Sequence, residues 1–171
     1  MSAGPGGNAR LAALDLLADV LDQGRNLGDT ANIDGAVRAH ALHLAYGVLR
    51  WYSALDWFAG RLMRKPLRSR DRDIHRLVLI GLFQLWRDGT PPHAAIHESA
   101  ECARLRDKPW AVGLVNAVLR RFQREQAALE QALEALVART GIGLRRFHLF
   151  GFSGGAQFAH RFAMLHPERI R

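Results

Sequence analysis

The sequence lacks the features that disulfide-stapled, secreted and membrane-spanning proteins require. Its 171 residues include one cysteine, Cys102, so no disulfide can form within the chain, and we expect a reducing, cytoplasmic location. No apolar run approaches the roughly 18 residues of a membrane span. The glycine-rich start lacks the basic and apolar parts of a secretory signal, and we expect residues 1–8 to be a disordered tail. Cys102 is expected to be a small residue inside a helix.

Acidic residues are also scarce relative to basic ones. The chain has 24 Lys and Arg against 16 Asp and Glu, which gives a net charge of +8. The densest basic stretch is residues 61–76, where only Asp71 and Asp73 oppose seven cationic side chains. Such a balance indicates an anionic partner, and RNA, DNA and an acidic protein all remain open at this point.

Strand-type alternation is absent before residue 140, and helical periodicity takes its place. Apolar side chains recur every three or four residues, as on the face shared by Trp51, Leu55, Phe58 and Leu62. We interpret these four as residues of the hydrophobic core, in preference to surfaces on which RNA bases stack. The sequence therefore predicts an all-α bundle. Its expected helices begin at Asn8 and end at Gly24, and then cover residues 36–63, 69–87, 93–105 and 109–138.

Four segments of this helical part resemble a known family. They are "LDWFAGRLMRKPL", "LVLIGLFQL", "PPHAAIHESAECAR" and "GLVNAVLRRFQRE". In this order and spacing they resemble the NusB-like N-terminal domain of ribosomal RNA cytosine-5 methyltransferases of the RsmB (Fmu/Sun) type, over about residues 9–130. The resemblance implies an all-α domain, here residues 9–138, that contributes to binding of ribosomal RNA. It also implies kinship with NusB, which binds RNA in transcription antitermination.

The catalytic part of that family is not found in this sequence. The resemblance implies a Rossmann-like domain that binds S-adenosylmethionine and carries catalytic cysteines, yet no cysteine follows Cys102 and no glycine-rich loop follows a strand. We therefore expect an RNA-binding domain that is not an enzyme as it stands and holds no cofactor. A protein-interaction module of the NusB type is the alternative, since NusB-like domains also bind protein partners.

Residues 139–171 have a different composition and predict a different element. "FHLFGFSGGAQFAHRFAMLHPERIR" resembles the nucleophile elbow of an α/β-hydrolase, with Ser153 at the centre of G-x-S-x-G. Activation of a serine requires a histidine and a carboxylate placed by further elements, and only His160, His166 and Glu168 follow Ser153. We therefore expect an incomplete fragment without a catalytic residue, irregular or with a short strand over residues 141–154. Residual serine hydrolysis through Ser153 is a further alternative function. A helix should follow over residues 155–165 and dock on the bundle or on a second copy as a homodimer.

Two groups of cationic side chains are the candidate RNA contacts. Arg68, Arg72 and Arg76 are four residues apart and are predicted to form one helical stripe, with about 6 Å of rise per step. The alternative is a solvated face whose charges pair with Asp71, Asp73 and Glu125. The full candidate set is Arg64, Lys65, Arg68, Arg72, Arg76, Arg120, Arg121 and Arg124.

His93, His97 and Glu101 are also four residues apart, which is a spacing compatible with zinc ligands. Three ligands on one helix would still need an open position and supporting partners, and His93 directly after two prolines is typical of a helix start. We therefore predict no metal site. We expect Asn116, within an apolar helix, to bond to backbone across the bundle.

Overall fold

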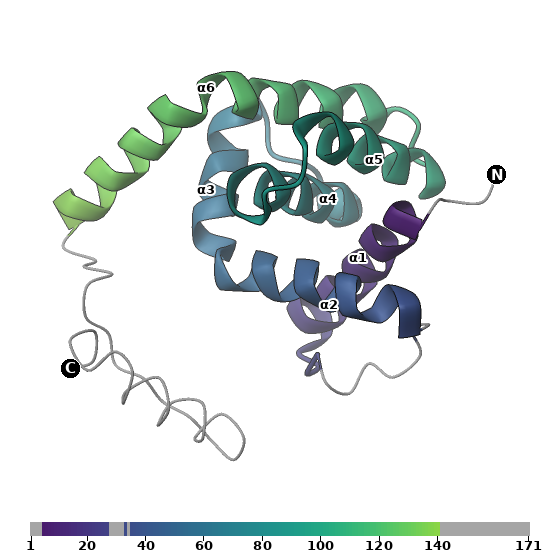
Figure 1. The fold of residues 1–171 in the computed structure, drawn as a ribbon. Helices are drawn as coiled ribbons and strands as arrows, with labels where there is room; N and C mark the ends of the chain where they lie inside the picture. Colours follow the sequence, from purple (N-terminus) through teal and green to yellow (C-terminus); the bar gives the residue numbers. More distant parts are fainter. Residues whose placement is uncertain (1–4, 28–32, 34, 141–171) are drawn as a thin grey trace, which may run out of the picture. The chain divides into compact units, whose positions relative to one another are not determined.

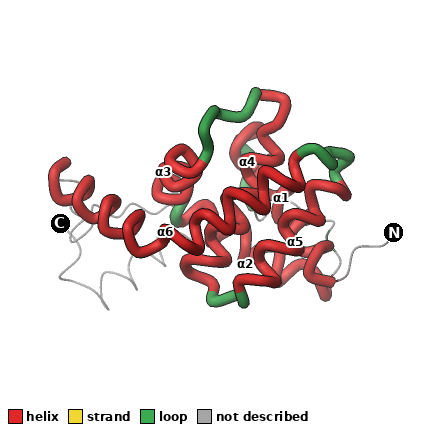
Figure 2. Tube along the Cα trace, turned by 90° about the horizontal axis from the view of Figure 1, so that it is seen from above, coloured by secondary structure: helices red, strands yellow, loops and turns green. Residues whose placement is uncertain are grey.

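The computed structural model describes residues 5–27, 33 and 35–140, and every regular element in this part of the chain is helical. Figures 1 and 2 show the arrangement. The all-α prediction is confirmed. The elements in order are α1 (Pro5–Gln23), α2 (Gly35–Arg50), α3 (Tyr52–Leu62), the 3-10 turn η1 (Ser69–Asp71), α4 (Arg72–Phe83), the π-helical turn η2 (Gln84–Asp88), α5 (Pro92–Leu105) and α6 (Ala111–Thr140).

Helix α4 forms the centre of the core, in contact with α1, α2, α3 and α5. Its residues from Leu77 to Phe83 are all buried, which explains the nearly unbroken apolar run in its sequence. Two glycines permit close packing here. A Cβ at Gly81 would lie 2.5 Å from Leu119 Cδ1 on α6, and a Cβ at Gly47 would lie 2.1 Å from the Phe83 ring. Any larger residue would require the Leu119 side chain to move at Gly81, or the Phe83 ring to move at Gly47.

The predicted helix over residues 36–63 is divided in the structure. It breaks at Trp51, whose φ of −108° and ψ of 15° lie outside the helical region, and α3 begins at Tyr52. The break lets both α2 and α3 pack on α4, and Leu55, Phe58 and Leu62 are buried as predicted. The prediction missed the break because apolar spacing continues through it, and spacing does not record a change of helix axis.

Other helix boundaries differ in a similar way. Helix α1 begins at Pro5, inside the predicted N-terminal tail, and proline suits a first helical turn. The predicted helix over residues 69–87 consists of η1, α4 and η2, and it ends at Gly89 with φ of +73°. Cys102 is fully buried in α5, as expected of a small residue inside a helix, and desolvation raises the pKa of its thiol to about 11.

The chain divides into two compact units, residues 1–129 and residues 130–171, with the boundary inside α6. The first part of α6 buries Ala111, Val115, Val118, Leu119 and Phe122 within the first unit. No helix of the described part is long and apolar enough to cross a membrane. The predicted irregular segment, the predicted C-terminal helix and Ser153 all lie outside the described residues.

Candidate nucleic-acid interface

The connection between α3 and η1 places several cations in solvent. Met63 leaves α3 with extended backbone, Pro66 follows, and Arg68 is also extended, with φ of −67° and ψ of 156°. The side chains of Arg64, Lys65 and Arg68 are exposed, and none forms an ion pair with a described residue. Their positive charge is therefore not neutralised within this part of the fold.

Arg121 on α6 joins the two predicted cationic groups. Its Nη1 donates a hydrogen bond of 3.2 Å to the carbonyl oxygen of Leu62, the last residue of α3, and its Nε donates one of 2.9 Å to Glu125. The hydrogen bond from Arg121 lowers the pKa of Glu125 below its ordinary value. This contact brings the arginines of α6 beside the cations of the connection. We define them together as the basic surface, which consists of Arg61, Arg64, Lys65, Arg68, Arg120, Arg121 and Arg124.

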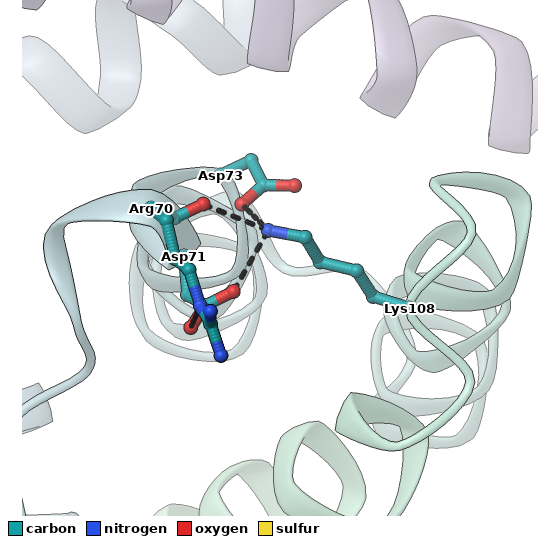
Figure 3. A network of polar contacts seen from close by, with 4 residues as sticks. All are labelled: Arg70, Asp71, Asp73 and Lys108. Atoms are coloured by element: carbon teal, nitrogen blue, oxygen red, sulfur yellow. Dashed lines mark hydrogen bonds and ion pairs between the residues drawn. The ribbon is translucent and has the colours of Figure 1, made fainter.

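Lys108 explains why the nearby aspartates do not neutralise this surface (Figure 3). From the α5–α6 connection its Nζ donates to Asp71 at 3.0 Å, to Asp73 at 2.7 Å and to the carbonyl oxygen of Arg70 at 3.0 Å. Partial burial works against the charge of Lys108, but the hydrogen bonds to Asp73 and Asp71 raise the pKa of its ammonium group. Both carboxylates therefore have a cationic partner in Lys108, and Asp71 has a second one in Arg70 at 3.8 Å.

The predicted stripe of Arg68, Arg72 and Arg76 is wrong in two respects. Arg68 precedes the helix in extended backbone, so the three residues do not share one helix face. Arg76 is only 6% exposed and pairs with Asp22 at the end of α1 at 2.5 Å, while the exposed Arg72 reaches the same carboxylate at 3.3 Å. The hydrogen bond from Arg76 lowers the pKa of Asp22. Because α4 packs against α1, the side chain of Arg76 faces α1, whereas Arg72 at the start of α4 remains exposed.

A hollow of about 720 Å³ lies between α5 and α6. Asn116 lines it and makes no hydrogen bond to a described residue, so the expected backbone bond is not seen. His93 and His97 lie at the same hollow, whereas Glu101 pairs with Arg104. Among the described residues no group of three metal-ligating side chains is brought together. The lining residues are Pro92, His93, Ala94, Ile96, His97, Glu98, Asn116, Arg120 and Gln123.

Sequence reasoning missed a buried polar link beside this hollow. Arg10 on α1 is only 2% exposed; it donates a hydrogen bond of 2.8 Å to Gln84 on η2 and forms an ion pair with Glu98 on α5. The signal available was an arginine at the buried edge of an apolar helix face, next to Ala9 and Ala13. Lys108 was missed as well, since a single lysine in a short connection has no distinctive spacing.

The comparisons with known proteins cover most of the chain. A family model described as the NusB family matches residues 7–124. Ribosomal RNA small subunit methyltransferase B of Pseudomonas putida is 42% identical over 132 residues, which are 74% of this chain and 30% of that protein. The proteins of the same name from Vibrio vulnificus and Escherichia coli O1:K1 are 43% and 36% identical, over 72% and 77% of this chain.

The chain spans about 30% of the length of these relatives, with 30% covered in the Vibrio vulnificus protein and 32% in the Escherichia coli protein. The reported matches give no support to the hydrolase resemblance of residues 147–171, and the family match ends at residue 124.

Proposed function

This chain belongs to the NusB family, and on that premise we propose that it binds RNA through the basic surface. Ribosomal RNA is the proposed ligand, because the relatives are named as methyltransferases that act on it. The observation that carries the proposal is the contact of Arg121 with Leu62, which unites the two cationic groups. In this proposal the chain works in the cytoplasm.

The geometry suits a phosphate backbone. Arg120 and Arg124 are exposed one helical turn apart, at about 6 Å of rise, which is comparable with the spacing of successive phosphates. The extended connection with Arg64, Lys65 and Arg68 adds cations beside them. Contacts of this kind position a strand and supply affinity, whereas sequence is read through base edges elsewhere.

The eight predicted contact residues have unequal roles in this proposal. Arg64, Lys65, Arg68, Arg120 and Arg124 are the principal phosphate contacts, because they are exposed and form no ion pair with a described residue. Arg72 and Arg121 are secondary contacts, because each is already paired with a carboxylate. Arg76 is assigned to the fold.

We further propose that this chain supplies binding and no catalysis of its own. The methyl transfer in the relatives' name is assigned to parts of those proteins that this chain does not match. Incubation of the chain with S-adenosylmethionine and small-subunit ribosomal RNA should then leave the RNA unmethylated, as read by transfer of a labelled methyl group. Methyl incorporation above a protein-free control would contradict this assignment.

The binding proposal is tested by fluorescence anisotropy with fragments of small-subunit ribosomal RNA over a range of salt concentrations. The triple substitution Arg64→Gln, Lys65→Gln and Arg68→Gln should weaken binding at least about tenfold and reduce the slope of log affinity against log salt by about 2. Arg25→Gln, Arg38→Gln and Arg50→Gln together are the matched control, since they remove the same charge outside the basic surface. Equal losses in both triple variants would mean that net charge alone drives binding.

A further inference from the structure

The hollow between α5 and α6 has the size and lining of a site for one nucleotide. Its volume of about 720 Å³ is within the range of small-molecule sites, roughly 300–1,000 Å³. Side chains of both helices line it, with His97 from α5 and Asn116, Arg120 and Gln123 from α6. The three α6 residues are spaced so that one helix face presents them together.

The polar groups of this face are available to a ligand. Asn116, Arg120 and Gln123 form no hydrogen bond with a described residue, whereas Glu98 at the edge is held by Arg10. A side-chain amide carries both donors and an acceptor, which is the combination that base edges require. Ile96 contributes an apolar part of the wall, and the exposed rings of His93 and His97 offer surfaces on which a base can stack.

Arg120 links the hollow to the basic surface, because it belongs to both. A strand with one phosphate near Arg124 and the next near Arg120 would bring an adjacent base to the mouth of the hollow. Only an unpaired base can enter, since a duplex keeps its bases stacked and its sequence-bearing groove is too narrow for side chains. A single-stranded segment, loop or bulge is therefore the form of RNA that fits.

We propose that the α5–α6 hollow receives one unpaired base of a bound RNA, with Asn116 and Gln123 reading its edge and Arg120 holding its phosphate. This inference rests on the proposed RNA binding, and it adds the site at which a preference for one base arises. The basic surface supplies affinity that depends little on sequence, and the hollow supplies discrimination. The two contributions are separable by substitution because they reside in different side chains.

The experiment measures binding of the 171-residue chain to 12-nucleotide RNAs of uridine, cytidine or adenosine alone. The wild type should prefer one of the three at least about fivefold over the weakest. Asn116→Leu with Gln123→Met removes the amides at similar volume and unchanged charge, so the preference should fall to less than twofold while the salt slope stays unchanged. In the wild type, the side-chain amide resonances of Asn116 and Gln123 should shift when the preferred RNA is added.

Two controls separate this inference from the binding proposal. Gln23→Met, at the exposed end of α1, should keep the base preference. The triple variant of Arg64, Lys65 and Arg68 should weaken binding of all three RNAs and keep their order. If the wild type binds all three equally, or if the amide variant keeps the full preference, the hollow is not the reading site although RNA binding stands. If the wild type binds none of them or of the ribosomal fragments, both proposals fail.

Discussion

Arg68 and Arg76 belong to the same dense basic stretch, yet the fold gives them opposite environments. Arg68 stands in extended backbone, exposed and without an acidic partner among the described residues. Arg76, in the second turn of α4, is buried against the end of α1 and paired with Asp22. A cationic residue can therefore serve binding or stability, and which of the two it serves depends on the position of its element in the core. Composition alone assigns both residues to binding.

The largest effect expected from this comparison is a change in the free energy of unfolding. Arg76→Ala should lower the free energy of unfolding by about 2 to 3 kcal/mol, because it removes a buried side-chain stem and the hydrogen bond to Asp22. Arg68→Ala should change it by less than about 0.5 kcal/mol, as exposed substitutions usually do. Urea unfolding of the full chain measures both.

Arg76→Met separates the contribution of the side-chain stem from that of the charge, since it keeps most of the stem and removes only the charge and its hydrogen bond. It should recover part of the stability that Arg76→Ala loses. If Arg68→Ala and Arg76→Ala lowered the free energy of unfolding equally, the division of this stretch into a binding part and a structural part would be wrong.

Lys108 pairs with Asp71 and Asp73, which lie between Arg68 and Arg76 in the sequence. Removal of Lys108 should therefore affect both RNA binding and the stability of the fold. Lys108→Met leaves Asp71 and Asp73 without their ammonium partner, and Asp71 is only 7% exposed. We expect a loss of about 1 to 2 kcal/mol in stability. We also expect severalfold weaker RNA binding, because Asp73 would lose its ion pair with Lys108 and Asp71 would keep only Arg70 at 3.8 Å, so negative charge would increase close to the basic surface.

Lys65→Met is the matched control for this substitution. It removes the same charge from an exposed side chain with no ion pair to a described residue, so it should weaken RNA binding and leave stability unchanged. Unchanged RNA affinity in Lys108→Met, measured by the same anisotropy assay, would show that the aspartates do not influence the basic surface.

The fold class and the core were predictable from the sequence because helical periodicity is a local property. Leu55, Phe58 and Leu62 were placed correctly from spacing alone. The break at Trp51 was not, since it depends on how α2 and α3 share the surface of α4. Helix continuity is a local expectation that tertiary packing can override.

The candidate site was predictable in composition and not in arrangement. The sequence indicates two cationic groups, but the contact that joins them is made between Arg121 and Leu62, which are 59 residues apart. Lys108 also pairs over a long sequence separation, 37 residues from Asp71 and 35 from Asp73, and this pairing removes the partners that the sequence alone assigns to the arginines. Long-range ion pairs have no spacing signature, so only the folded chain distinguishes paired from available cations.

The smallest predicted effect concerns the turn that delivers Lys108. Asp107 follows α5 with a φ of +55°. The N–H of Lys108 donates to the carbonyl oxygen of Ala103, and the N–H of Asp107 donates to the carbonyl oxygen of Arg104. This pair of hydrogen bonds is the helix ending that usually has glycine in the left-handed position. A non-glycine residue in this left-handed conformation is strained, so Asp107→Gly should raise the free energy of unfolding by about 0.5 to 1 kcal/mol. Asp107→Ala, which keeps a Cβ and lacks the polar side chain that tolerates this conformation, should lower it. RNA affinity of the glycine variant should remain within about twofold of wild type, because Lys108 still reaches Asp71 and Asp73. A glycine variant with lower stability in urea unfolding would show that the Asp107 side chain contributes a contact that outweighs the backbone strain.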